Sequence, residues 1–586
     1  MGGPVRDLRA FLELIRARGE LHEIEAEVDP RLEIAEIHRR TIARGGPALL
    51  FRRVKGSPHP VVTNLFGTID RTWLAFGRRP IELIERIVHA AETIVPPSLG
   101  KLWRLRGLVR EGLRIGFKSV TRAPILDVTD ESPDLSALPA ITSWHSDGGP
   151  FVTLPLVHTE HPASGKPNLG VYRMHVHDAR TTGMHFQIHK GGGFHFHEAE
   201  RRGERLPVTV FVGGPPALIL AGVAPLPEDV PELLLASLLL GERLRRVKRA
   251  PHPLIADAEF ALVGHLAPGE RKPEGPFGDH YGYNSLAHDY PVFHVERVHR
   301  RRDAIWPATV VGRPRQEDFF IGDFLQELLS PLFPLVMPSV RALWSYGETG
   351  FHSLAAARVA ERYPREAVGT GFRILGEGQL SLTKCLIVTN AAVDLRDFRA
   401  VLGAVLERID WRSDLFVFSH VSQDTLDYTG PEVNRGSKAI FVAVGEPRRA
   451  LREAYDGGLP PGARRVEVFA PGCLVVEGAA YDAEKELPGR LARHAGFDGW
   501  PLVVLVDDAA EATASTELFL WTTFTRMEPA ADLHGREQIV ARFHVGLEGP
   551  VVIDARMKPW YPEVMEVDDA TRDLVDRRWG EYGVPE

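Results

Sequence analysis

From about residue 119 to residue 310, proline and glycine repeatedly interrupt the chain and leave short apolar runs between them. Four of these runs read FVTLPLVHT, NLGVYRMHVHD, GMHFQIH and PVTVFVGG. Runs of this length and spacing predict several short strands in a barrel or a folded sheet. Within the region, PEDVPELLLASLLLG predicts a helix. We therefore expect a central β-rich domain over residues 119–312.

Helical and extended patterns flank this region on both sides. Residues 1–118 combine amphipathic helical segments with the short apolar strands PALLF and HPVVTNLFG, which predicts an N-terminal α/β domain. Residues 313–365 predict a helical connection, and residues 366–586 predict a C-terminal α/β domain. A chain of 586 residues exceeds the size at which one hydrophobic core keeps growing, so several domains are expected.

The C-terminal region contains two stretches with the same order of elements. Residues 385–418 and 502–534 each predict a strand, a loop that carries aspartate, a helix and an acidic turn. This order is common in α/β domains, so a chance match and an internal duplication both remain open.

The overall composition excludes several classes of protein. With 44% hydrophobic and 25% charged residues, the chain resembles an ordinary soluble globular protein. Its two cysteines, Cys385 and Cys473, cannot build a disulfide framework and favour a reducing compartment, so we expect a cytoplasmic protein. Apolar runs such as LLLASLLLG are shorter than the roughly 20 residues needed to cross a bilayer.

The distribution of charge bears on possible partners. A net charge of −8 and a pI near 6.3 argue against a nucleic-acid binder, because phosphate groups require a basic surface. Two local basic clusters, at 243–249 and 297–303, interrupt this acidic background. A solvated face or a contact between copies of the chain is the simplest interpretation of both, and attraction to a membrane surface is the alternative.

Histidine is concentrated in one part of the central region. Eight of the 24 histidines lie between residues 158 and 197. In MHFQIHK, strand-like alternation places His185, Gln187 and His189 on one polar side. The glycines that follow Lys190 could cradle a phosphate, or could form a loose turn. The sequence lacks the usual nucleotide-binding fingerprints and the G-x-S-x-G motif of common hydrolases.

Two carboxylates stand close together in the segment EGPFGD. Glu274 and Asp279 are five residues apart, and Gly275, Pro276 and Gly278 keep the segment out of a helix. An ordinary surface turn would also have this composition. A pair of carboxylates held near each other can instead serve in acid–base chemistry.

Four motifs together resemble those of the UbiD-type decarboxylases, enzymes that use prenylated FMN. They are NLGVYR at 168–173, MHFQIHKGG eleven residues after Arg173, the helix start that carries Glu232, and EGPFGDHYGY. The resemblance extends over roughly residues 120–390, with weaker similarity in DYTGPEVNRGSK and DARMKPWYP. The implied fold is α+β, with an N-terminal α/β domain, a central split β-barrel that binds the flavin, a helical connection, and a C-terminal α/β domain with an insertion.

The resemblance implies a role for each matching residue. Asn168, His189 and Glu232 would bind Mn²⁺ or Mg²⁺, often with a monovalent cation such as K⁺ nearby. The flavin contacts would be Val171, Tyr172, Arg173, His185, Phe186, Gln187, Lys190 and Gly191, with Lys384 as a further phosphate contact. Arg173, Glu274 and Asp279 would form the acid–base set. In it Asp279 is the proton donor, expected to be held protonated at neutral pH, and Glu274 forms an ion pair with Arg173.

The activity implied is non-oxidative, reversible decarboxylation of an aromatic or α,β-unsaturated carboxylic acid. The context GDHYGYNSLAHDYPVFHV is most similar to the quinone-biosynthesis branch, so the expected substrate is 4-hydroxy-3-polyprenylbenzoate or a related quinone precursor. A flavin prenyltransferase would supply the cofactor. The family also implies a homo-oligomer, and a polyprenyl substrate implies peripheral contact with a membrane.

Two other functions remain compatible with these residues. One is a flavin-independent hydrolase or lyase that uses a divalent metal held by the histidine-rich segment. The other is a flavin-binding protein without catalytic activity.

Overall fold

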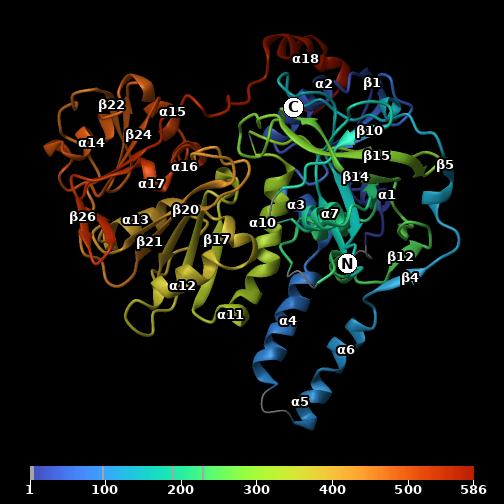
Figure 1. The fold of residues 1–586 in the computed structure, drawn as a ribbon, viewed down its shortest axis with the longest axis horizontal. Coiled ribbons are helices and arrows are strands. Elements are labelled where there is room, and N and C mark those ends of the chain that lie inside the picture. The colour runs from blue at the N-terminus through green and yellow to red at the C-terminus, as the bar shows by residue number, and fades with distance from the viewer. Residues whose placement is uncertain (1–4, 95–97, 188–189, 227–229, 314, 586) are drawn as a thin grey trace. The chain divides into compact units, whose positions relative to one another are not determined.

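The computed structural model describes residues 5–94, 98–187, 190–226, 230–313 and 315–585. The chain divides into two compact units. Unit 1 comprises Met1–Leu329 and Glu563–Glu586, and unit 2 comprises Ser330–Pro562. Both units mix helices with sheets, which confirms the α+β class (Figure 1). The three domain boundaries expected from the sequence stay predictions.

Unit 1 begins with a small sheet covered by helices. Its strands follow the order β1-β2-β3-β16, and β16 comes from the far end of the central region. The elements are α1 (Leu8–Arg16), β1 (Leu21–Val28), α2 (Glu33–Ala43), β2 (Ala48–Val54), β3 (Val61–Thr63) and β16 (Trp306–Pro307). Helix α1 forms because Leu8, Phe11, Leu12 and Ile15 share one buried face. The Asp7 side chain caps it by accepting from the Ala10 backbone N–H at 2.8 Å.

A group of helices follows this sheet. They are α3 (Ile69–Phe76), α4 (Arg79–Thr93), α5 (Leu99–Arg104) and α6 (Arg106–Gly112). Helices α4, α5 and α6 form a hairpin that extends away from the sheets of unit 1 (Figure 1). At the other end of the chain, α18 (Asp569–Tyr582) returns to pack on α2 and β1. There the Tyr582 hydroxyl donates to Glu33 Oε1 at 2.6 Å.

The centre of unit 1 is a seven-stranded antiparallel sheet. Its order is β10-β15-β14-β11-β7-β8, and β5 also pairs with β15. The strands are β5 (Val128–Asp130), β7 (Pro155–Glu160), β8 (Pro167–Val171), β10 (Thr181–Gly183), β11 (Leu206–Val212), β14 (Phe260–Glu274) and β15 (His288–Arg300). Among the described residues no pairing joins the ends of this order, so the folded sheet is open and does not form a closed barrel.

Smaller elements complete unit 1. The strands are β4 (Phe117–Ser119), β6 (Phe151–Val152), β9 (Met174–His175), β12 (Leu244–Val247) and β13 (Leu254–Ile255). The helices are α7 (Gly191–Arg202), α8 (Pro216–Val223), α9 (Glu232–Leu240) and α10 (Glu317–Leu329). Helix α7 packs against β7, β8, β11 and β14, and one buried apolar cluster joins the central sheet to the N-terminal sheet.

Unit 2 contains two five-stranded sheets with the same topology. The first has the order β17-β18-β19-β21-β20, and the second has the order β22-β23-β24-β28-β25. In both, successive pairs are antiparallel, parallel, parallel and antiparallel. The two stretches with matching order, 385–418 and 502–534, occupy equivalent places in these sheets. This agreement over whole sheets favours an internal duplication over a chance match.

The elements of unit 2 have the following bounds. The strands of the sheets are β17 (Val340–Ser345), β18 (Leu354–Val359), β19 (Cys385–Thr389), β20 (Leu415–Ser422), β21 (Arg435–Ala443), β22 (Ala463–Ala470), β23 (Cys473–Gly478), β24 (Leu502–Val506), β25 (Leu533–His534) and β28 (Val551–Asp554). A separate hairpin consists of β26 (Gln538–Ala541) and β27 (His544–Leu547). The helices are α11 (Phe333–Val336), α12 (Glu366–Leu375), α13 (Phe398–Arg408), α14 (Leu487–Ala492), α15 (Ala509–Thr513), α16 (Thr516–Arg526) and α17 (Pro529–Asp532).

One helical stretch, Glu317–Val336, is long and apolar enough to cross a membrane by length and composition alone. Its first part is α10, which packs on α3 and α4 and buries Phe324 and Leu328. The stretch is partly buried: 28% of its apolar window is covered by the rest of the described chain.

Candidate active site

Three residues that are far apart in sequence meet beside the central sheet. Arg173 follows β8, Glu274 ends β14, and Asp279 lies in the loop between β14 and β15. The Arg173 Nε donates to Glu274 Oε1 at 2.8 Å, and its Nη1 forms an ion pair with Asp279 Oδ2. All three side chains are buried. The structure thus brings together the acid–base set expected from the sequence.

The charges in this set stabilise one another. Burial alone would raise the pKa of Asp279, but Arg173 and His280 outweigh burial and lower it to about 2. Burial is opposed in the same way at Glu274, where Arg173 and His185 hold the pKa well below its ordinary value. Asp279 is therefore a carboxylate at neutral pH in this structure. A protonated Asp279 was expected from the sequence, and the ion pair with Arg173 is the physical reason for the difference.

The loop that carries Asp279 is held in place by two side chains that sequence reasoning missed. Asp147 Oδ1 accepts from the Gly278 backbone N–H at 2.9 Å. Ser285 Oγ accepts from Arg173 Nη2 at 3.1 Å and from the Phe277 backbone N–H at 3.2 Å. Burial raises the pKa of Asp147 to about 6. An aspartate and a serine in loops have no distinctive sequence signal, since their contacts arise only in the folded chain.

Two further titratable side chains adjoin Asp279. Its Oδ1 lies 2.5 Å from His280 Nδ1 and accepts from the His280 backbone N–H at 2.7 Å. Asp318, in the first turn of α10, lies near His280 and Asp279. Burial raises the pKa of Asp318 to about 6 although the charge of His280 opposes this shift. Its Oδ1 atom is buried and has no hydrogen-bond partner in the described part of the chain.

The raised pKa of Asp318 predicts a pH-dependent effect on stability. A carboxyl with a higher pKa in the folded chain stabilises the fold below its unfolded pKa, and this contribution is lost as pH rises through the folded value of about 6. We expect Asp318→Asn to raise the free energy of unfolding at pH 8 by about 1–3 kcal/mol, and to change it little near pH 4. Urea unfolding at both pH values measures the difference.

Asp323→Asn on the same helix is the matched control. Asp323 forms an ion pair with Arg315 at 2.9 Å, so its loss should destabilise slightly at pH 8. An Asp318→Asn variant that is less stable than the wild type at pH 8 would contradict the interpretation.

The residues expected to contact a flavin line one region of unit 1. The Tyr172 hydroxyl accepts from the Gly192 backbone N–H at 3.2 Å, and its ring packs edge-on against Phe186 at 5.0 Å. His185 Nδ1 lies 3.0 Å from Glu274 Oε2, while its Nε2 is buried with no partner among the described residues. Burial and Arg173 lower the pKa of His185, so its ring is neutral. The remaining members are half-buried: Val171, Gln187, Lys190 and Gly191.

The glycine-rich segment after Lys190 is neither a loose turn nor a free loop. Gly191 begins α7, with Lys190 at its N-cap position. The start of a helix carries backbone N–H groups and a partial positive charge, which favour an anion such as phosphate. A side chain at Gly191 would place its Cβ 2.1 Å from Asn168 Oδ1, so a larger residue would have to displace the Asn168 side chain.

Two of the three expected metal ligands lie side by side. Asn168 is on β8 and Glu232 begins α9, and Glu232 Oε2 accepts from the Leu169 backbone N–H at 3.0 Å. Burial raises the pKa of Glu232. The third expected ligand, His189, lies outside the described residues. No group of three His, Cys, Asp or Glu ligands occurs among the described residues, but an amide oxygen beside a half-buried carboxylate fits a hard cation.

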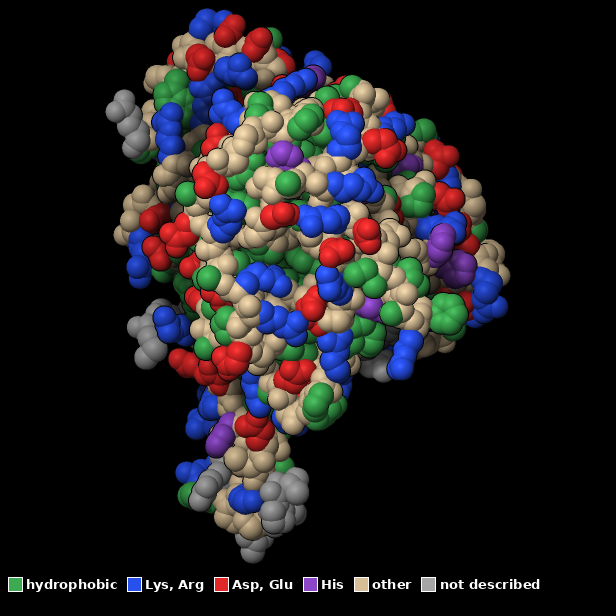
Figure 2. Space-filling model, turned by 90° about the vertical axis from the view of Figure 1, so that its left-hand side faces the viewer, with side chains coloured by type: hydrophobic (Ala, Val, Ile, Leu, Met, Phe, Trp, Pro, Cys, Tyr) green, Lys and Arg blue, Asp and Glu red, His purple; other side chains and the backbone are tan. Residues whose placement is uncertain are grey.

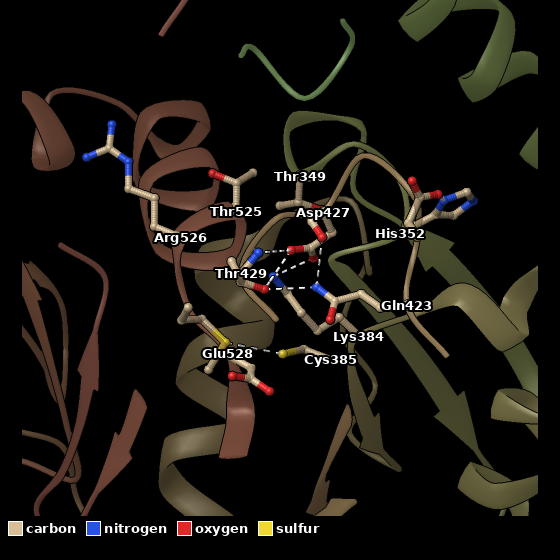
Figure 3. A network of polar contacts seen from close by, with 12 residues as sticks. Thr349, His352, Lys384, Cys385, Gln423, Asp427, Thr429, Thr525, Arg526 and Glu528 are labelled. Atoms are coloured by element: carbon tan, nitrogen blue, oxygen red, sulfur yellow. Dashed lines mark hydrogen bonds and ion pairs between the residues drawn. The ribbon is translucent and has the colours of Figure 1, made fainter. Parts of the chain in front are cut away.

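Lys384, the additional phosphate contact expected from the sequence, belongs to unit 2. It is buried and forms an ion pair with Asp427 at 2.7 Å, and Thr429 adjoins this pair (Figure 3). Gln423 Nε2 donates to Thr429 Oγ1 at 2.9 Å and extends the network (Figure 3). Within unit 2, Lys384 is therefore held by a carboxylate and not presented as a free cation.

Comparison with known proteins agrees with this geometry. Family models for the 3-octaprenyl-4-hydroxybenzoate carboxy-lyases match the chain in three parts. The N-terminal domain model covers residues 12–91, the Rift-related domain model covers 118–314, and the C-terminal domain model covers 319–443. Residues 444–586 lie outside these models and contain the second sheet of unit 2.

Relatives match nearly the whole chain. An uncharacterized protein of Chlamydia trachomatis is 51% identical over 579 residues, which is 98% of this chain and 99% of that protein. A protein of Chlamydia pneumoniae that is named as part of a 4-hydroxybenzoate decarboxylase is 50% identical over 577 residues, 98% of each chain.

Solved structures share the fold. Vanillic acid decarboxylase of Sedimentibacter hydroxybenzoicus has a TM-score of 0.67 and 23% identity, covering 78% of this chain and 96% of that one. A UbiD-class enzyme of Pelotomaculum thermopropionicum in complex with FMN has a TM-score of 0.62 and 26% identity, covering 78% and 98%. Fold, site and relatives together define a carboxy-lyase. The chain belongs to the UbiD family.

Proposed function

We propose that the protein is a non-oxidative, reversible decarboxylase of a hydroxyaryl carboxylic acid and that it works with prenylated FMN. The observation that carries this proposal is the buried set of Arg173, Glu274 and Asp279. A buried carboxylate that is held in place by a guanidinium and contacts a histidine can take up and return a proton.

The side chains would divide the work in the following way. Arg173 would fix the positions of both carboxylates. Asp279, a carboxylate in the present structure, would take up a proton and deliver it to the carbon atom from which CO₂ has departed. His280 touches Asp279 at 2.5 Å and can pass that proton. In the reverse direction Asp279 would accept the proton and CO₂ would bond to the same carbon.

A flavin and a metal ion would complete the site. Loss of CO₂ from an sp² carbon leaves an electron pair, and prenylated FMN would supply the electron sink that side chains lack. Tyr172, Phe186 and the start of α7 would hold it, and His185 Nε2, which has no partner among the described residues, offers it a hydrogen bond. Asn168, Glu232 and His189 would bind Mn²⁺ or Mg²⁺, with K⁺ as a second ion.

The proposed substrate is 4-hydroxy-3-polyprenylbenzoate or a related quinone precursor. It is supported by the family models and by a relative named for 4-hydroxybenzoate decarboxylation. The proposal also includes a homo-oligomer in the cytoplasm, a flavin prenyltransferase as the source of the cofactor, and contact with a membrane that contains the polyprenyl substrate.

Replacing Glu232 tests the metal site. We expect Glu232→Gln, expressed together with a flavin prenyltransferase, to lower bound Mn²⁺ by about tenfold or more, because an amide lacks the negative charge of the carboxylate ligand. Metal analysis by mass spectrometry of the purified protein measures this. Glu517→Gln, at the first turn of α16, is the matched control and should bind metal like the wild type. Equal metal content in all three proteins would refute the assignment.

A spectrum and a substrate screen test the proposed function. The protein would be produced with and without the prenyltransferase, its visible spectrum recorded, and hydroxyaryl and acrylic acids offered to it. We expect CO₂ release from hydroxyaryl acids only in the preparation that contains the modified flavin. Turnover with divalent metal alone would favour the flavin-independent alternative.

A further inference from the structure

The helical hairpin α4–α6 exposes large apolar side chains that no described part of unit 1 covers. Trp103 is 66% exposed, Val109 is 61% exposed and Leu113 is 67% exposed. No described side chain of α6 is buried. The hairpin is the narrow projection of the molecule in the space-filling view (Figure 2). These three side chains thus contribute little to the core of unit 1, whereas Leu83 and Ile84 of α4 are buried.

These apolar side chains share a face with arginines. Helical spacing relates Arg106 and Arg110 to Val109 and Leu113. The two arginines therefore flank the two apolar side chains. The Arg106 guanidinium lies over the Trp103 ring at 3.4 Å. Basic side chains beside tryptophan and aliphatic residues are typical of segments that lie at a membrane interface.

The charge of this segment is opposite to that of the whole protein. Residues 99–118 contain six Lys or Arg and a single acidic residue, Glu111, whereas the chain has a net charge of −8. Glu111 is paired with Arg79 at 2.5 Å. It lies in the groove between α4 and α6, about 920 Å³ in volume, which Trp103, Val109 and Leu113 do not line. The exposed face of α5 and α6 is therefore apolar and basic, and the one acidic residue of this segment lies in the groove.

A second basic element adjoins the base of the hairpin. Strand β4 follows α6 and pairs with β12, which belongs to the basic cluster at 243–249. The Arg246 guanidinium lies over the Phe117 ring at 4.1 Å, and Arg243 Nη2 donates to the Leu113 carbonyl at 3.2 Å. Lys248 and Arg249 are exposed next to this contact. Basic side chains thus occur on both α6 and β12, which are joined through β4.

The family models offer no assignment for this segment. They match residues 12–91 and 118–314, and leave 92–117 between them. The segment therefore lies outside the domains that the models describe, although it is joined to both.

We propose that α5, α6 and β12 dock this protein on an anionic membrane surface. Trp103, Val109 and Leu113 would enter the headgroup region, while Arg106, Arg110 and the cluster at 243–249 would contact lipid phosphates. Each basic side chain near such a surface strengthens partitioning by roughly fivefold. The idea rests on the proposed function, because a polyprenyl substrate is held in a membrane.

Vesicle sedimentation tests the proposal with the full chain and needs no turnover. The probes are vesicles of phosphatidylcholine alone and of phosphatidylcholine with 30 mol% phosphatidylglycerol, a composition of about one anionic lipid in three. We expect binding to the anionic vesicles and at least tenfold weaker binding to the neutral ones. Arg106→Glu with Arg110→Glu, and separately Trp103→Ser with Leu113→Ser, should each lower binding to anionic vesicles by about tenfold or more.

Matched variants keep the test specific. Arg205→Glu with Arg302→Glu changes two exposed arginines elsewhere in unit 1, and Phe543→Ser removes a fully exposed aromatic ring from unit 2. Both controls should bind like the wild type. Circular dichroism and decarboxylation of a water-soluble hydroxyaryl acid should be unchanged in the hairpin variants.

Several results would overturn the proposal. They are no binding of the wild type to anionic vesicles, equal binding to neutral vesicles, or unchanged binding by both hairpin variants. Sedimentation velocity measures the oligomeric state of the same variants and can give one further contradicting result. If the hairpin variants dissociate an oligomer that the controls retain, the hairpin contacts a second copy of this chain and the membrane assignment is wrong. Failure of the proposed function would appear separately, as vesicle binding without decarboxylation.

Discussion

Replacing Arg173 with methionine is expected to abolish decarboxylation, with a loss of at least about 10³-fold, and to destabilise unit 1 by about 3–5 kcal/mol. The guanidinium is the counter-charge of two buried carboxylates, Glu274 and Asp279, and methionine fills similar space without charge. Both carboxylates would then be buried without a cation, so their pKa values would rise. Initial rates of the flavin-loaded enzyme and urea unfolding measure the two effects.

The pH dependence of the Arg173→Met variant provides an internal check. In the wild type, Glu274 and Asp279 have lowered pKa values, so the stability they provide is present above about pH 4 and is lost as pH falls toward 2. The variant should lose this dependence. Arg180→Met, at an exposed arginine seven residues later, should leave rate and stability unchanged. A variant at Arg173 with more than a tenth of wild-type activity would be inconsistent with its assigned role.

Replacing Asp279 with asparagine is expected to lower decarboxylation by about 10²–10⁴-fold while the flavin spectrum is retained. Asparagine keeps the shape of the side chain but cannot take up and return a proton. The rate of CO₂ release and the exchange of the ring proton for deuterium in the product should fall together, because both depend on the same proton transfer. Parallel spectra separate this effect from loss of the cofactor.

Asp289→Asn is the matched control for this experiment. Asp289 lies ten residues later, is exposed and belongs to β15. It should exchange protons and release CO₂ at the wild-type rate. If Asp279→Asn retained exchange while Glu274→Gln lost it, Glu274 would be the proton donor and the two roles would be reversed.

The sequence predicted the members of the candidate site better than their electrostatics. Arg173, Glu274 and Asp279 could be singled out because their motifs stand in a recognisable order along the chain. The ionised state of Asp279 could not be predicted from the sequence, because it depends on an ion pair with Arg173 that only the folded chain creates. The same limit applies to Asp147, Ser285 and Asp318, which lie on separate segments and carry no local motif.

Prediction of the fold met a similar limit. The short strands of the central sheet and the α+β class were evident from the spacing of proline and glycine. Whether that sheet closes depends on pairing between distant strands, and the described strands leave it open. The repeated strand order in the C-terminal region was ambiguous by itself. Equal topology of two whole sheets was needed to favour duplication. The pairing of β21 with β19 and the pairing of β28 with β24 cannot be inferred from the local sequence pattern.

The most direct test of the central claim uses 4-hydroxy-3-polyprenylbenzoate labelled with ¹³C in its carboxyl group. Three preparations of the wild-type protein are compared: one loaded by a flavin prenyltransferase, one reconstituted with plain FMN and Mn²⁺, and one given Mn²⁺ alone. The account predicts labelled CO₂ from the first preparation and none above background from the other two. Equal release from all three, or release from the metal-only protein, would contradict it.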